Sequence, residues 1–162
     1  MTSTYSSNLK IELMATGDQS GTWGDTTNTN LGTLLEQAIA GYTTQSLTAV
    51  ANPFALTIPN GASGTGRYYV IEFTGTVASG QVVTVPAVQK PYIFYNNGST
   101  NSVTVKVSGQ TGVTIAVGKK AIVYTNGTDV IEVANAPVTE AGTQTLTNKT
   151  LTSPTINTGT IS

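Results

Sequence analysis

Short apolar alternations, each followed by a turn-forming residue or pair, recur along the middle of the chain and limit its fold more than any other feature. In each run apolar residues occupy every second position, as in a strand with one buried face. The runs are Phe54/Leu56/Ile58, Tyr69/Ile71/Phe73, Val83/Val85, Ile93/Tyr95, Val103/Val105/Val107, Val113/Ile115/Val117, Ile122/Tyr124 and Ile131/Val133. The turn signals are Asn60-Gly61, Ser79-Gly80, Asn97-Gly98, residues 109–112, Gly118 and Asn126-Gly127. About eight or nine short strands predict an antiparallel β-sandwich or jelly-roll-like domain over residues 43–137.

Residues 1–42 are expected to form an N-terminal segment with one amphipathic helix. The apolar residues of one helix face follow the i, i+3, i+4, i+7, i+8 spacing: Leu31, Leu34, Leu35, Ala38 and Ile39. Gly41 would end the helix in a left-handed conformation, and residues 25–30 offer several N-caps. A helix of three or four turns is marginal alone, so its stripe is expected to dock on the β-domain, a sister subunit or a partner protein.

Trp23 is the single tryptophan of the chain. One interpretation places its ring against the first helical turn and the β-domain. The other makes it an attachment residue, since Trp is enriched among interface hot spots. The candidate attachment or interface residues are therefore Trp23, Leu31, Leu34, Leu35 and Ile39.

Residues 138–162 contain a threonine-led repeat of five residues. Each repeat threonine is followed by Leu or Ile, at Leu146, Leu151, Ile156 and Ile161. Burying four such side chains contributes roughly 6–12 kcal/mol, whereas ordering the backbone of the repeat costs roughly 18–36 kcal/mol. The repeat is therefore expected to wind with identical chains into the start of a trimeric β-shaft, with these four residues as its core. A disordered tail is the alternative.

The residue types present argue against catalysis. The chain contains no Cys and no His, which removes thiolate chemistry and the commonest general base and metal ligand. Its carboxylates show no marked pair of the kind a glycosidase needs: Asp18, Asp25, Glu72, Asp129, Glu132 and Glu140. We expect no enzymatic activity, no metal and no cofactor.

The charge pattern limits the partners. Charged residues make up 9% of the chain, Arg67 is the only arginine and Lys119-Lys120 the only basic pair. Nucleic-acid binding would need a cluster of basic residues, and the chain has none, so no nucleic-acid partner is expected. There is no apolar run long enough for membrane insertion and no signal peptide pattern at the N-terminus, so synthesis in a cytoplasm is expected.

Three stretches, one in each segment, carry a family resemblance. Residues 16–31 (TGDQSGTWGDTTNTNL) resemble the N-terminal motif of tail-fibre-like virion proteins of tailed bacteriophages, notably marine and cyanobacterial phages. Residues 118–131 (GKKAIVYTNGTDVI) are similar to the last strands of the β-domain that follows this motif. Residues 142–156 (GTQTLTNKTLTSPTI) resemble the start of many phage fibre shafts.

The resemblance implies a structural virion protein, made in the cytoplasm of the bacterial host and located in a tail appendage. It implies a homotrimer whose N-terminal part fastens to the tail, the baseplate or an adaptor protein. The shaft would then serve host adsorption, with host surface glycans as ligands of distal parts. Because Ile161-Ser162 begins another repeat unit, the chain is expected to be a fragment without the distal tip.

An alternative function is a carbohydrate-binding or capsid-decorating β-sandwich module of the virion. Tyr68, Tyr69, Tyr92 and Tyr95 could offer aromatic rings to a glycan. Strand alternation, however, is expected to place one Tyr of each pair in the core.

Overall fold

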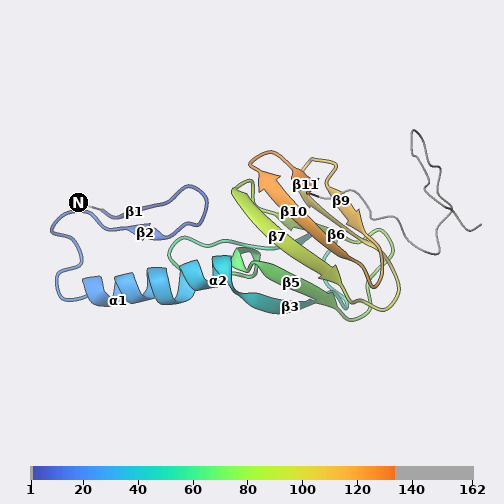
Figure 1. The fold of residues 1–162 in the computed structure, drawn as a ribbon, viewed down its shortest axis with the longest axis horizontal. Coiled ribbons are helices and arrows are strands. Elements are labelled where there is room, and N and C mark those ends of the chain that lie inside the picture. Colours follow the sequence, from blue (N-terminus) through green and yellow to red (C-terminus); the bar gives the residue numbers. More distant parts are fainter. Residues whose placement is uncertain (1, 134–162) are drawn as a thin grey trace, which may run out of the picture.

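The computed structural model describes residues 2–133, which form an N-terminal arm and a β-domain of two sheets. The arm consists of a short hairpin, β1 (Thr4–Tyr5) and β2 (Glu12–Leu13), and one continuous helix made of α1 (Trp23–Asn28), the π-helical segment η1 (Thr29–Leu35) and α2 (Glu36–Ile39). The arm extends from one end of the β-domain, and the hairpin lies along the helix (Figure 1). The repeat with Leu146, Leu151, Ile156 and Ile161 lies outside the described residues.

The β-domain confirms the mainly-β fold expected from the apolar alternations. The five-stranded sheet has the order β11-β10-β7-β5-β3, with β3 (Tyr42–Ser46), β5 (Val70–Thr74), β7 (Gln89–Asn96), β10 (Lys120–Asn126) and β11 (Val130–Glu132). The four-stranded sheet has the order β4-β6-β8-β9, with β4 (Phe54–Ala55), β6 (Val82–Val85), β8 (Val103–Val107) and β9 (Val113–Ile115). A short 3-10 turn, η2 (Thr65–Arg67), precedes β5.

The expectation of antiparallel sheets is wrong for much of the domain. The pairs β3·β5, β5·β7, β4·β6 and β6·β8 are all parallel. They are parallel because the chain crosses from one sheet to the other after each of β3 to β7, and it therefore re-enters each sheet in the same direction. Hairpins join only β8 to β9 and β10 to β11 within this domain, where both pairs are antiparallel.

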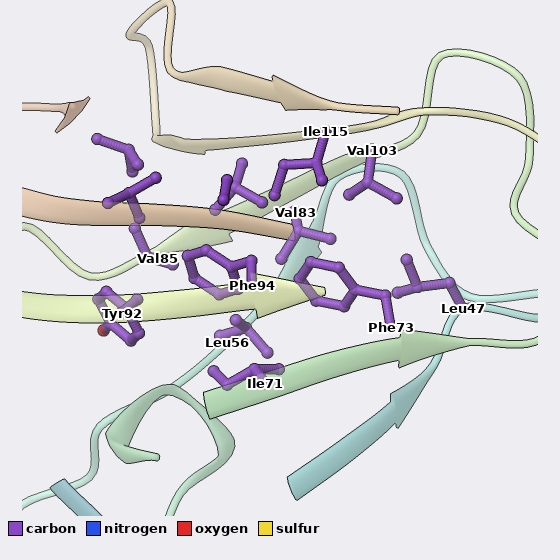
Figure 2. Packing of buried hydrophobic residues seen from close by; sticks show 14 of the residues in the cluster. Leu47, Leu56, Ile71, Phe73, Val83, Val85, Tyr92, Phe94, Val103 and Ile115 are labelled. Atoms are coloured by element: carbon purple, nitrogen blue, oxygen red, sulfur yellow. The ribbon is translucent and has the colours of Figure 1, made fainter. Parts of the chain in front are cut away.

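The two sheets face one another across a single apolar core. Its inward residues come from both sheets, and Figure 2 shows side chains of both filling the space between them. In the five-stranded sheet the ring of Phe94 stacks between Phe73, at 5.5 Å, and Tyr92, at 5.0 Å between ring centroids. All three are buried. Fully buried side chains of this size contribute roughly 1.5–3 kcal/mol each, so this layer is a main source of stability.

Three of the apolar runs seen in the sequence face away from this core. In β7 the buried residues are Tyr92 and Phe94, whereas Ile93 and Tyr95 lie on the opposite face and are partly exposed. The runs Ile122/Tyr124 of β10 and Ile131/Val133 at β11 also point outward. Each of these strands thus has apolar residues on both faces, and the pattern alone did not show which set is inside.

The helix differs from its prediction at both ends. It begins at Trp23, whose preceding residue Thr22 makes no side-chain cap bond, so the caps expected at residues 25–30 lie inside the helix. Gly41 follows the helix, but its φ is not positive. Glycine is required there because a Cβ would lie 2.5 Å from the Gln37 carbonyl oxygen and 2.8 Å from the Tyr68 ring. This close approach brings the helix end onto the β-domain.

Candidate functional site

The π-helical segment divides the predicted apolar stripe into two faces. A residue in a π-helix turns less about the helix axis than one in an α-helix, so positions four apart become aligned. Asn30, Leu34 and Ala38 follow this spacing and are buried. Leu31, Leu35 and Ile39 follow it one position later, on the neighbouring face. The prediction that Leu31, Leu34, Leu35, Ala38 and Ile39 share one docked face is therefore wrong.

The buried face of the helix holds the hairpin of the arm. Leu34 is fully buried. The Asn30 side-chain oxygen accepts a hydrogen bond from the Glu12 backbone N–H at 3.1 Å, and its amide donates to the Glu12 carbonyl at 2.8 Å. The Asn30 side-chain amide therefore pairs with the backbone of β2 through both a donor and an acceptor, as the backbone of a neighbouring strand would. A buried polar group with both partners satisfied fixes one register between hairpin and helix.

The neighbouring face of the helix is largely exposed. Trp23 is 63% exposed, Leu31 is 58% exposed and Ile39 is 65% exposed, while Leu35 is partly buried. With 63% of its surface exposed, the Trp23 ring is not buried between the helix and the β-domain. Four of the five predicted attachment residues thus lie on this face, and Leu34 belongs to the folded interior of the arm.

Arg67 joins the arm to the β-domain. Its side chain is fully buried, and its guanidinium donates hydrogen bonds to the carbonyls of Leu9, Pro59 (2.7 Å) and Ala62 (2.9 Å). The Leu9 carbonyl belongs to the loop between β1 and β2. Burial lowers the pKa of Arg67, but an arginine remains charged in proteins. Removing the guanidinium would leave three carbonyls without this donor, so Arg67 is a structural tie between two parts of the molecule.

Two further contacts hold the same hairpin loop. The Gly61 N–H donates to the Lys10 carbonyl at 2.8 Å, and the Gln89 N–H donates to the Asn8 side-chain oxygen at 3.0 Å. On the helix side, the Tyr69 N–H donates to the Gln37 carbonyl at 3.0 Å. The arm is therefore fixed to the β-domain through the hairpin loop and through the helix end.

Lys90 is a second buried cation close to this junction. Its Nζ donates to the carbonyls of Tyr68 and Pro91, both at 3.1 Å, and lies 3.6 Å from the centroid of the Tyr92 ring. Burial is the main cause that lowers the pKa of Lys90 to about 7, and the positive charge of Arg67 is the second cause of this shift. Because its donors are taken up by two carbonyls and a ring face, Lys90 bonds to the protein itself and offers no free ammonium to a ligand.

A cavity of about 610 Å³ lies where the hairpin loop, the helix end and the start of β7 meet. Its lining is mainly apolar and consists of Asn8, Leu9, Ala38, Ile39, Tyr69, Gln89, Lys90 and Pro91. Ile39 belongs to the exposed helix face, and Pro91 points outward from the five-stranded sheet. The cavity thus connects the exposed face of the helix with the outer face of that sheet.

The tyrosines considered for glycan binding are not gathered into a platform. Tyr92 is buried, and its hydroxyl donates to the Gly66 carbonyl at 2.8 Å. Tyr68 packs against the core and accepts a hydrogen bond from Gln37. The ring of Tyr95 lies on the outer face of the sheet under Lys120, 4.2 Å from its Nζ. The structure therefore brings no pair of free rings together from these positions.

Sequence reasoning missed the buried roles of Arg67 and Lys90 and the apolar outer face of the five-stranded sheet. The signal for the outer face was present, as consecutive apolar residues in β7 and β10.

Within residues 2–133, no group of three or more acidic, His or Cys residues is placed to hold a metal ion. No helix in the same range is long and apolar enough to cross a membrane.

Comparison with known proteins adds no relative to this description. No protein-family model matches the chain, and neither does any curated protein or solved structure. The assignment of a function therefore depends on the residues and geometry described above.

Proposed function

We propose that the chain is part of a tailed-phage tail fibre that anchors the fibre to the tail or baseplate and starts a trimeric shaft for host adsorption. The resemblance of residues 16–31 to the attachment motif of such fibres supports the class of protein. The architecture supports the division of roles, because the arm that contains this motif extends from one end of the β-domain (Figure 1).

The observation that carries the proposal is the exposed apolar face of the arm. Trp23, Leu31 and Ile39 lie on the outside of a helix whose other face is already occupied by the hairpin. Covering the exposed parts of three such side chains would contribute roughly 3–5 kcal/mol. Exposed apolar residues that share one face are typical of a protein–protein contact, and a Trp at one end is a typical anchor.

The junction between arm and β-domain supports an anchoring role. An anchor must transmit its position to the part it holds, so its connection has to be rigid. Here Arg67, buried and bonded to carbonyls of the hairpin loop and of the β-domain, joins the two parts. The close contact at Gly41 fixes the helix end as well.

Incorporation into virions tests the anchoring role. In the phage that encodes the chain, the double variant Trp23→Ser, Leu31→Ser should fold normally, because both side chains are exposed, and should be lost from purified virions. Val117→Ser is the matched control, since Val117 is also an exposed apolar residue but lies between β9 and β10, away from the arm. Normal incorporation of a soluble, folded double variant would contradict the proposal.

A further inference from the structure

A row of apolar side chains crosses the outer face of the five-stranded sheet. The strand register places one residue from each strand side by side, in the order Val133, Ile122, Ile93, Val70 and Tyr42. Neighbouring strands lie about 4.8 Å apart, so the row is about 19 Å long. More than half of the surface of Val133, Ile122 and Tyr42 is exposed.

A second, shorter row lies beside the first. The register aligns Ile131, Tyr124 and Pro91, and all three are exposed. Together, the large exposed residues of the two rows present roughly 400 Å² of surface, which is in the range of the largest apolar patch on an ordinary monomer and is often functional. We call the two rows the outer-face patch.

The other sheet of the same domain provides an internal comparison. Apart from Val82, the outward positions of the neighbouring strands β6, β8 and β9 are polar: Thr84, Thr104, Lys106 and Thr114. The hydroxyls of Thr104 and Thr114 lie 3.0 Å apart. This is the alternation expected of a sheet with one face in water. The same chain thus solvates one outer face and leaves the other apolar, so general composition does not explain the outer-face patch.

We propose that the outer-face patch packs against another copy of this chain. The inference deepens the proposed function, because it assigns the contact between the β-domains of the trimeric fibre. Val133 is both the last described residue and one end of the patch. Residues 134–144, which separate it from the repeat, span at most about 40 Å when extended.

This tether makes copies of the chain the favoured occupant. If the repeats of several chains wind together, their outer-face patches are held within a short distance of one another. A short tether corresponds to an effective concentration in the millimolar range, so the contact can be weak by itself and still form. The patch provides about half of the roughly 800 Å² that each partner buries in a standard interface, and the polar residues around it would supply the rest.

The charges beside the patch also fit a copy of the same surface. The next row along the sheet contains Lys120, Tyr95 and Glu72, one cation and one anion. Glu72 accepts hydrogen bonds from the Tyr42 hydroxyl and from the Asn97 amide, and these bonds lower its pKa. A second copy can place its cation opposite this anion. A nucleic acid or an anionic membrane would need several cations on this surface, and these rows offer it only Lys120.

Charge insertion tests the contact on the full chain. Ile122→Lys would place a charge at the centre of the patch, where loss of an interface residue costs about 2 kcal/mol or more, which corresponds to about 30-fold weaker association. Ile122→Lys should therefore shift the oligomer towards monomer in sedimentation measurements, while Thr114→Lys, on the outer face of the other sheet, should leave it unchanged.

Single-cysteine variants identify the neighbour directly, because the chain contains no cysteine of its own. Ile122→Cys should cross-link between chains with a short bis-maleimide, and Thr114→Cys should not. An oligomer that forms normally with Ile122→Lys and fails to cross-link through Ile122→Cys would overturn the inference and leave the trimer intact. Protection of the cysteine in a monomer would also overturn it, since a segment of the same chain would then cover the patch. A wild-type chain that is monomeric and absent from virions would refute the proposed function as well.

Discussion

The buried ammonium of Lys90 should make the stability of the protein depend on pH near neutrality. In the unfolded chain a lysine has a pKa of 10.5, whereas burial lowers the pKa of Lys90 to about 7 in the fold. Between these two values the unfolded state binds a proton that the folded state does not. Stability therefore rises with pH in this window, and the full penalty for the buried charge is present below pH 7.

The magnitude follows from the two pKa values. A shift of one pKa unit corresponds to 1.36 kcal/mol, so linkage gives a gain of about 2 kcal/mol between pH 6 and pH 8.5. The carbonyls of Tyr68 and Pro91 and the Tyr92 ring favour the charged form, which makes this figure an upper value. Most of the gain should appear above pH 7, where Lys90 loses its proton in the folded state.

Urea unfolding of the full chain from pH 6 to pH 8.5, at one protein concentration, measures this slope. The matched variant is Lys90→Met, which keeps an unbranched side chain of nearly the same length and removes the charge. Its absolute stability is not informative, because the carbonyls of Tyr68 and Pro91 lose a donor. The slope of its unfolding free energy against pH is informative. If Lys90→Met retains the same rise in stability with pH as the wild type, another group causes the rise and the assignment to Lys90 is refuted.

Four further substitutions test the arm and its junction. Arg67→Met should loosen the hairpin loop, and hydrogen exchange at residues 8–12 should become faster. The unfolding free energy should fall by about 2–4 kcal/mol, because carbonyls are left without a donor. Unchanged exchange would contradict the role of Arg67 in joining the arm to the β-domain. Leu34→Ala should cost about 2–5 kcal/mol in unfolding free energy, whereas Leu31→Ala, on the exposed face, should cost under about 0.5 kcal/mol; equal costs would refute the two-face helix. Gly41→Ala should lower the melting temperature, by a loss of about 1–3 kcal/mol, because its Cβ meets the Gln37 carbonyl and the Tyr68 ring.

The sequence predicted the strands better than their arrangement. Alternation reports that a segment is extended, and each of the eight runs contains or adjoins one of the strands β4 to β11. A turn signal reports only that the chain changes direction. It does not say whether the next strand joins the same sheet, so Asn97-Gly98 could be taken for a hairpin although the chain crosses there to the other sheet. Strand β3 escaped prediction because its residues Tyr42–Ser46 are mostly Thr, Gln and Ser.

The helix shows why a residue pattern can predict a helix and still misjudge which of its residues share a face. The spacing of Leu31, Leu34 and Ile39 assumes an α-helix throughout. The π-helical segment Thr29–Leu35 changes the rotation per residue, and Leu34 then turns towards the hairpin while Leu31 and Ile39 remain outside. Asn30 was the residue that could have indicated the buried face. It lies four positions before Leu34, and its polar side chain does not fit an apolar stripe but can form the buried hydrogen bonds to β2 that the structure shows.

The two ends of the apolar row on the five-stranded sheet connect the proposals made for this chain. Tyr42 is the first residue of β3, directly after the helix and Gly41, and Val133 directly follows β11. The row therefore extends from the point where the chain leaves the arm to the point where residues 134–162 begin. Packing of this row against another copy would fix the relative positions of the helical arms and of the starts of the repeats in one step. A single apolar contact could in this way set both the spacing of the proposed attachment faces and the alignment of the chains in the proposed shaft.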